Sequence, residues 1–256
     1  MGCDLGMYSA KAVIVEDGNI LAADSLPYRS NPRQAAVEVI NRALQQAGIS
    51  RSQVERCVGT GFGGKAVPGI NGYAGEEECL IRAIRHINPQ VRTVIDVGSH
   101  TLHAFTLDSE GKLWNSAVTD DCSAGMGRFI ELMSSSLEIP VDDLSRDFLA
   151  STHPVLLTNV CVVLAESDVI SHVNEGYNRT DLFAGVLMGV AARIAGVARR
   201  AGLNGKVAMV GGVARNPVVV RELERKLELE LADPGQVDPQ VMAALGAALL
   251  AAEMKG

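Results

Sequence analysis

The sequence predicts an α/β protein made of two related lobes, with a ligand cleft between them. Two observations support this prediction. A strand, a glycine turn and a second strand open the chain, and the same pattern begins again near residue 93. Both copies place an aspartate two residues before a glycine, at Asp4 and Gly6 and again at Asp96 and Gly98. A repeated strand-turn-strand unit of this kind is typical of a duplicated fold.

The first lobe is expected to span residues 1–90. Its predicted elements are a strand that ends before Gly6, strands over 12–15, 19–25 and 57–61, and helices over 32–47 and 76–86. Asp17 and Gly18 predict the tight turn of a hairpin. Gly48 is expected to end the first helix, because glycine adopts the left-handed backbone conformation without steric cost.

The second lobe is expected to span residues 91–241, after a boundary at Asn88-Pro89. Its predicted elements are strands over 93–98, 101–107, 112–118 and 206–210, and helices over 125–133, 162–173 and 182–198. The alanine-rich segment 242–256 is predicted to be a helix that packs back on the first lobe.

Composition excludes two classes of partner. The 256 residues carry a formal net charge of −7, and an acidic protein does not displace counterions from nucleic acid. The apolar stretch 182–198 contains Arg193 and several glycines and is short for a bilayer, so we expect a buried helix and no membrane insertion. The first residues lack the pattern of a secretion signal, and we therefore expect a cytoplasmic protein.

Three glycine segments predict a nucleotide site. An Asp-x-Gly turn between two strands lets backbone N–H groups approach phosphate oxygens, while the carboxylate holds Mg2+ through water. Such turns occur at Asp4 and at Asp96, and a third glycine segment, 210–216, lies between a predicted strand and a predicted helix. A single turn of this type is a weak signal, but the three together favour one bound nucleotide.

Several motifs along nearly the whole chain resemble a known family. They are Cys3-Asp4-Leu5-Gly6 with Lys11, Thr60-Gly61-Phe62-Gly63, Val94-Ile95-Asp96-Val97-Gly98, the segment 121–129 around Cys122, the segment 161–167 after Cys161, and Gly211-Gly212-Val213-Ala214-Arg215-Asn216. The chain resembles the actin-like ATPases that activate 2-hydroxyacyl-CoA dehydratases or form the ATPase subunits of benzoyl-CoA reductase. The two cysteine motifs are the specific part of the resemblance, since Asp-x-Gly turns also occur in sugar kinases and chaperones.

The resemblance implies an actin-like ATPase fold of duplicated ribonuclease H-like lobes that binds ATP and Mg2+. It gives Asp4 and Asp96 catalytic roles at the phosphates and the metal ion. The residues expected to bind the nucleotide are Gly6, Ser9, Lys11, Gly98, Gly211, Gly212, Ala214 and Asn216.

The resemblance also implies a dimer in which Cys122 and Cys161 of each subunit ligate one shared 4Fe-4S cluster. Each cysteine lies close before a predicted helix, whose N-terminal dipole favours a thiolate. Two cysteines in one chain are too few for a cluster of four thiolates, so a second subunit, identical or a paralogue, is expected to complete it. The implied electron donor is ferredoxin or flavodoxin, and the implied acceptor is a CoA-thioester dehydratase or reductase.

The chain departs from this family after the second aspartate. Dehydratase activators read Gly-Gly-Gln-Asp where this chain reads Gly98-Ser99-His100-Thr101. His100 is therefore the candidate for ordering the attacking water. Two other functions stay open, a small-molecule kinase of the same fold and a nucleotide-binding regulatory subunit with little turnover. A kinase needs a carboxylate to deprotonate the acceptor hydroxyl, and this chain has Thr101 at the position where a carboxylate would be expected.

Overall fold

The structure is a computed structural model of the chain. It describes residues 1–119, 126–141, 151, 153–155, 162–233, 235 and 237–254. The chain forms two compact units, Met1–Val91 with Pro234–Gly256, and Arg92–Asp233. The sequence predicts boundaries after residues 90 and 241, whereas in the structure the segment that returns to the first unit is Pro234–Gly256.

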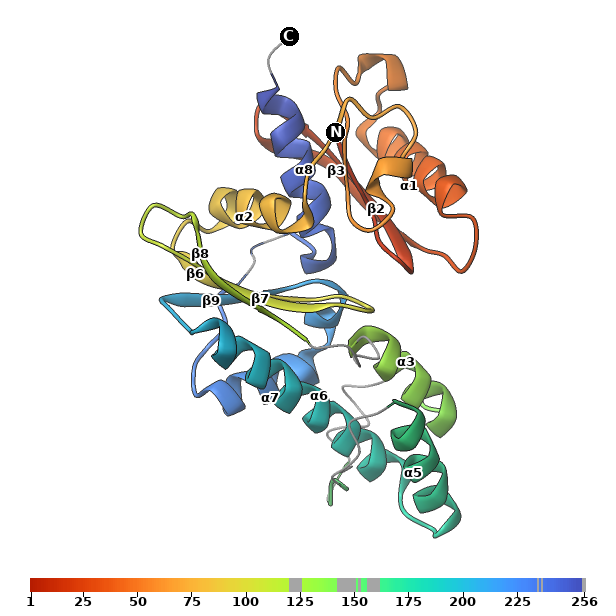
Figure 1. The fold of residues 1–256 in the computed structure, drawn as a ribbon. Helices are drawn as coiled ribbons and strands as arrows, with labels where there is room; N and C mark the ends of the chain where they lie inside the picture. Colours follow the sequence, from red (N-terminus) through yellow and green to blue (C-terminus); the bar gives the residue numbers. More distant parts are fainter. Residues whose placement is uncertain are drawn as a thin grey trace. The chain divides into compact units, whose positions relative to one another are not determined.

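The first unit contains a five-stranded sheet in the order β3-β2-β1-β4-β5 (Figure 1). Its elements are β1 (Gly2–Leu5), β2 (Ser9–Glu16), β3 (Asn19–Pro27), α1 (Pro32–Ala47), β4 (Val58–Thr60), β5 (Gly72–Tyr73), α2 (Glu76–Ile87) and α8 (Met242–Glu253), with short 3-10 turns η1 (Arg51–Gln53), η2 (Gly64–Ala66) and η5 (Pro239–Val241). Strands β1, β2 and β3 pair antiparallel, whereas β1, β4 and β5 pair parallel.

Local sequence accounts for the bounds of α1. The Asn31 side chain accepts a hydrogen bond from the Gln34 amide, and Pro32 occupies the first turn, where no amide hydrogen is needed. Gly48 ends the helix with a left-handed φ of 68°. The helix therefore covers the residues that the apolar spacing predicted.

Helix α8 packs closely in the first unit, where it contacts α2 and strands β1 and β2 (Figure 1). A Cβ atom added at Gly2 of β1 would lie 2.1 Å from the Ala244 carbonyl oxygen, and one added at Gly246 of α8 would lie 1.7 Å from the Cys79 carbonyl oxygen. Only glycine allows backbones to approach so closely, and the alanines of α8 allow the rest of this contact. Cys3 and Leu5 belong instead to the cluster built on α1, so the two helices cover opposite faces of β1.

The second unit contains a four-stranded sheet in the order β8-β7-β6-β9. Its elements are β6 (Val91–Val97), β7 (Leu102–Leu107), β8 (Leu113–Val118), α3 (Met126–Leu137), α5 (Val162–Asn174), α6 (Arg179–Ala201), β9 (Lys206–Val210), the 3-10 turn η4 (Gly212–Arg215) and α7 (Pro217–Leu227). This order repeats β3-β2-β1-β4 of the first unit. A parallel bridge between Val207 and Leu231 adds a contact beside β9 that corresponds to β5. The second unit is therefore built as a copy of the first.

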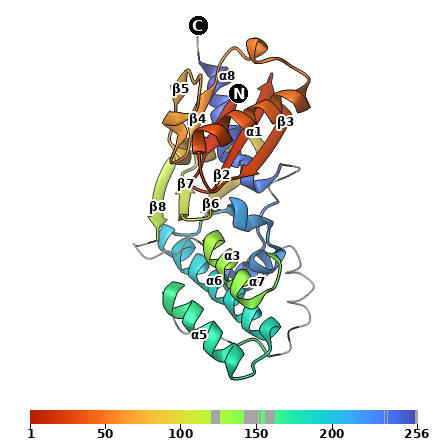
Figure 2. The same cartoon turned by 90° about the vertical axis from the view of Figure 1, so that its right-hand side faces the viewer.

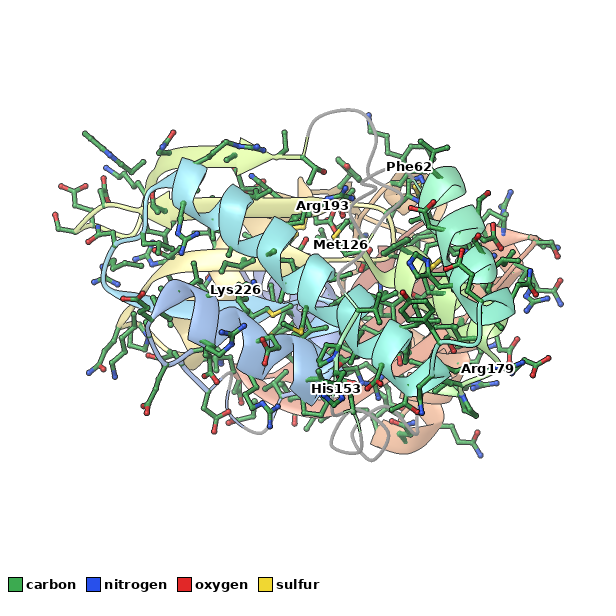
Figure 3. The ribbon with its side chains drawn as sticks, turned by 90° about the horizontal axis from the view of Figure 1, so that it is seen from below. Phe62, Met126, His153, Arg179, Arg193 and Lys226 are labelled. Carbon is green, nitrogen blue, oxygen red and sulfur yellow. The ribbon has the colours of Figure 1, made fainter. Side chains whose placement is uncertain are left out.

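Helix α6 forms the centre of the second unit. Figure 2 shows α3 and α5 beside α6, and Figure 3 shows α6 and α7 side by side, with Arg193 on α6 and Lys226 on α7. Among the described residues, α6 alone is long and apolar enough to cross a membrane by length and composition. However, 67% of its tested window is buried inside the protein, as in the core helix of a folded domain.

Candidate functional site

The end of β1 carries a buried ion pair. Asp4 and Lys11 face each other across β1 and β2, and the Lys11 Nζ donates to Asp4 Oδ2 at 2.8 Å. Their side chains are 3% and 12% exposed. The second carboxylate oxygen, Asp4 Oδ1, is buried and has no hydrogen-bond partner among the described residues. Because a buried oxygen without a partner is costly, Oδ1 is available to a ligand.

The first glycine turn, residues 6–9, lies directly beside this pair. The Gly6 amide donates to the Ser9 carbonyl at 3.0 Å and closes the turn. A Cβ atom at Gly6 would lie 3.2 Å from the Lys11 Nζ, so the ammonium group lies close under the glycine. The predicted residues Asp4, Gly6, Ser9 and Lys11 therefore form one group in the structure.

Tyr28 was not predicted, although it belongs to the same group. Its hydroxyl donates to the Gly6 carbonyl oxygen, and its amide donates to the Tyr8 carbonyl oxygen at 2.9 Å. Burial raises the pKa of the Tyr28 phenol, so it stays protonated and remains a donor. A lone tyrosine just after the predicted strand 19–25 carries no motif, and no signal in the sequence could have identified it.

Gly61, which follows β4, belongs to the same group around Asp4. Its φ of 81° is left-handed, and a Cβ atom there would lie 2.2 Å from Asp4 Oδ1. The backbone after β4 therefore passes directly over the carboxylate, which only glycine permits.

The second unit repeats this arrangement around Asp96. Asp96 is 7% exposed and lies opposite His103 in the pairing of β6 and β7. The second glycine turn, residues 98–101, is closed by the Gly98 amide, which donates to the Thr101 carbonyl at 2.9 Å. Gly211, with φ 86°, follows β9, and a Cβ atom there would lie 2.7 Å from Asp96 Oδ1. Gly61 and Gly211 are thus equivalent, as are Asp4 and Asp96.

Helix α3 is attached to the second glycine turn. The amides of Gly127 and Arg128, in the first turn of α3, donate to the carbonyls of Gly98 and Ser99, both at 3.1 Å. Helix N-termini leave such amides without partners inside the helix, and here the glycine turn supplies the acceptors. A Cβ atom at Gly127 would lie 3.1 Å from the Ser99 Cα, so the helix end and the turn are in close contact.

The third glycine segment leads into α7 through η4. The Asn216 Oδ1 accepts hydrogen bonds from the Val218 and Val219 amides, at 3.0 and 3.1 Å, and so caps α7. Its Nδ2 is buried and has no partner among the described residues, which leaves one donor for a ligand. Gly212 and Ala214 are half-buried in η4. The sequence predicted Asn216 as a nucleotide contact but did not identify it as a helix cap.

His100 is exposed within the second glycine turn, and its assignment to catalysis stays a prediction. The proposed cluster ligands Cys122 and Cys161 lie outside the described residues. Helix α5 begins at Val162, directly after position 161. The Ser136 hydroxyl of α3 donates to Glu166 Oε1 of α5 at 3.0 Å, which joins the two helices that follow the cysteine motifs.

The remaining three cysteines, Cys3, Cys57 and Cys79, are buried and free. Burial raises the pKa of the Cys79 thiol to about 12, and it also raises the pKa of Cys3 and of Cys57. A thiol held in its protonated form is a poor metal ligand. Within the described part of the chain, no three His, Cys, Asp or Glu residues are grouped to hold a metal ion.

Comparison with known proteins gives matches over nearly the whole chain. A model of the BadF/BadG/BcrA/BcrD ATPase family matches residues 1–251. The chain is 34% identical to the 2-hydroxyisocaproyl-CoA dehydratase activator of Clostridioides difficile, over 98% of this chain and 94% of that protein. It is 34% identical to the (R)-2-hydroxyglutaryl-CoA dehydratase activating ATPase of Acidaminococcus fermentans, over 98% and 96%. With a subunit of the benzoyl-CoA reductase of Thauera aromatica it shares 26% identity, over 97% and 91%.

The solved structure of the activator of the 2-hydroxyisocaproyl-CoA dehydratase from Clostridium difficile, with bound ADPNP, has a similar fold. It superposes with a TM-score of 0.91 at 33% identity, covering 100% of this chain and 97% of that one. The predicted family resemblance and the predicted actin-like ATPase fold are both confirmed.

Proposed function

Because the chain belongs to the BadF/BadG/BcrA/BcrD ATPase family, we propose that it hydrolyses ATP to deliver a low-potential electron from a 4Fe-4S cluster to a CoA-thioester dehydratase or reductase. Relatives that activate such dehydratases support the acceptor class. One structural observation carries the coupling of ATP to the cluster. The second glycine turn is hydrogen-bonded to α3, the helix that follows the Cys122 motif.

The described residues fit a bound nucleotide. Asp4 Oδ1 and Asn216 Nδ2 are buried polar atoms that lack partners among the described residues. The Lys11 ammonium under the first glycine turn supplies positive charge for a phosphate group. Gly61 and Gly211 keep the space beside the two aspartates free of side chains. Asp4, Lys11 and Gly61 belong to the first unit, and Gly211 and Asn216 belong to the second.

Each of these residues has a chemical role in hydrolysis. Bound ATP supplies the phosphoanhydride bond. Asp4 and Asp96 would hold Mg2+ directly or through its water ligands, and the ion would neutralise charge that develops on the phosphates. Lys11 orients the phosphates, and His100 orders the attacking water beside the second turn. Carboxylate oxygens are the ligands that Mg2+ prefers.

A 4Fe-4S cluster takes four thiolates, and Cys122 and Cys161 would supply two from each subunit. The buried thiols of Cys3, Cys57 and Cys79 are unsuited to this role because burial raises their pKa. We therefore propose a dimer of identical or paralogous subunits in the cytosol, reduced by ferredoxin or flavodoxin. The link between Ser136 and Glu166 keeps α3 and α5 together, so a movement of one helix reaches both cysteine motifs.

Anaerobic purification tests this function. The protein should be a brown dimer with about four irons per two chains, because one cubane takes four cysteine ligands. Cys122→Ala and Cys161→Ala should each abolish the iron content and the visible spectrum. Cys79→Ala, the matched control in the core of the first unit, should retain both. A colourless protein after anaerobic reconstitution would overturn the electron-transfer function and favour the small-molecule kinase.

A further inference from the structure

Tyr28 holds the first glycine turn from outside it. The Gly6 amide closes the turn from within, by donating a hydrogen bond to the Ser9 carbonyl. Tyr28 adds two more, from its hydroxyl to the Gly6 carbonyl and from its amide to the Tyr8 carbonyl. Both carbonyls are therefore tied to the residue that follows β3, so Tyr28 fixes two peptide groups of the turn, Gly6–Met7 and Tyr8–Ser9.

Because Tyr28 holds the Gly6 carbonyl, it also fixes the direction of the Met7 N–H. In a trans peptide the C=O and the following N–H lie in one plane and point in opposite directions. When the Tyr28 hydroxyl holds the Gly6 carbonyl, the Met7 N–H points to the other side of the turn. The same hydrogen bond occupies the carbonyl oxygen, which would otherwise repel a phosphate oxygen. Tyr28 thus sets which side of the turn offers a donor.

Tyr28 lies next to the residues of the candidate site. The Tyr28 ring packs on the cluster of apolar residues around α1, while its hydroxyl reaches the turn. Lys11 and Asp4 are close enough to act electrostatically on the phenol. Gly6 therefore lies between the Lys11 ammonium and the Tyr28 hydroxyl.

We propose that Tyr28 is a positioning residue for the terminal phosphates of ATP. By holding the Gly6 carbonyl it aims the Met7 amide at these phosphates, while the Lys11 ammonium beside the turn binds their negative charge. The proposal rests on the proposed binding of ATP at Asp4, Gly6 and Lys11, and it is independent of the cluster.

Tyr28→Phe tests the proposal, since it removes the hydroxyl and keeps the ring that packs on the core. Dissociation constants for ATP and for AMP are measured by calorimetry on the full chain. The loss of one neutral hydrogen bond typically changes an equilibrium constant about fivefold, so the affinity for ATP should fall about fivefold. The affinity for AMP, which lacks the two terminal phosphates, should stay unchanged. Turnover at saturating ATP should change less than twofold, since ground-state positioning affects KM first.

Tyr73→Phe is the matched control, because Tyr73 is 46% exposed in the same unit and its ring contacts Lys65. It should leave both affinities at the wild-type value. Equal ATP affinities in wild type and Tyr28→Phe would overturn the role of Tyr28 alone. An equal loss for ATP and AMP, with a lower melting temperature, would also overturn it by showing a purely structural role. A wild-type protein that binds neither nucleotide would overturn the proposed function and this role with it.

Discussion

In both glycine turns the glycine amide donates to the carbonyl three residues later, and the glycine carbonyl accepts from a group outside the turn. The outside donors differ. In the first turn the donor is the Tyr28 side chain, at the end of β3 in the same sheet. In the second turn it is the Gly127 amide, at the start of α3. Duplication kept the backbone of the turn, while the group that holds it became different in each unit.

The different outside donors suit the two turns to different tasks. The first turn is tied to its own sheet, so it is suited to hold phosphate in a fixed place. The second turn is tied to a helix, so a displacement of the turn also displaces α3. The aspartates differ in the same way, because Asp4 is paired with Lys11 while Asp96 lies opposite His103. We therefore expect the first unit to anchor the nucleotide and the second to respond to it.

The largest effect is expected from the aspartates. Asp96→Asn should lower the turnover of ATP by about 1,000-fold and change the dissociation constant for ATP less than tenfold, since charge stabilisation acts mainly in the transition state. Asp4→Asn should lower turnover less than Asp96→Asn does, because one oxygen of Asp4 already accepts a hydrogen bond from Lys11. Steady-state kinetics with both variants measure the difference. Equal losses would show that the two units share the catalytic work evenly.

The second effect concerns the stability of the first turn. Lys11→Met should destabilise the protein by about 3 kcal/mol in denaturant unfolding, because it leaves the buried Asp4 carboxylate unpaired. Adding Asp4→Asn to this variant should restore part of the loss. The control is Lys112→Met, whose partner Glu110 is 69% exposed. It should cost less than about 0.5 kcal/mol. A Lys11→Met variant as stable as this control would contradict the anchoring role.

The third effect concerns the equivalent glycines. Gly61→Ala and Gly211→Ala should each destabilise by about 2 kcal/mol or more, since the new Cβ atom combines left-handed strain with a collision. The collisions are with Asp4 Oδ1 at 2.2 Å and with the Val97 carbonyl oxygen at 2.5 Å. Gly202→Ala is the control, because its φ of 80° is similar and no atom lies within 4 Å. Gly202→Ala should lose only the stability that the left-handed strain removes, about 1 kcal/mol. Similar losses at all three glycines would show that the backbone does not approach the aspartates closely.

Sequence patterns predicted the elements that local rules determine. The bounds of α1 and β9 agree with the prediction, because capping residues and a short apolar run mark them directly. Strand β2 begins at Ser9, earlier than the predicted start at residue 12. Pairing with β3 extends the strand through Lys11, a residue that apolar alternation does not select. Strand β5 was missed because two residues are too few to form a pattern.

The sequence predicted the motifs of the candidate site, but it did not predict the contacts that hold the two glycine turns in place. Asp4, Asp96 and the glycines stand out because a turn constrains residue type at fixed spacing. Tyr28 and the docking of α3 on the second turn depend on contacts distant in sequence, which spacing does not encode. Asn216 was predicted for a ligand although its Oδ1 serves the backbone of α7. A capping asparagine and a ligand-binding asparagine look the same in a sequence.

The smallest expected effect tests the attachment of α3. Alanine is favoured over glycine inside a helix by about 1 kcal/mol, so Gly196→Ala on the exposed face of α6, with no atom within 4 Å of its new Cβ, should stabilise the protein by about that amount. Gly127→Ala should lose this gain, because the new Cβ atom would lie 3.1 Å from the Ser99 Cα and 3.2 Å from the Gly98 carbonyl oxygen. Hydrogen exchange at the Gly127 and Arg128 amides should become faster in this variant, since the crowding loosens their bonds to the turn. If Gly127→Ala stabilises the protein as much as Gly196→Ala, and both amides already exchange quickly in the wild type, α3 is not held tightly on the second turn. The two glycine turns would then differ in their donors without differing in their tasks.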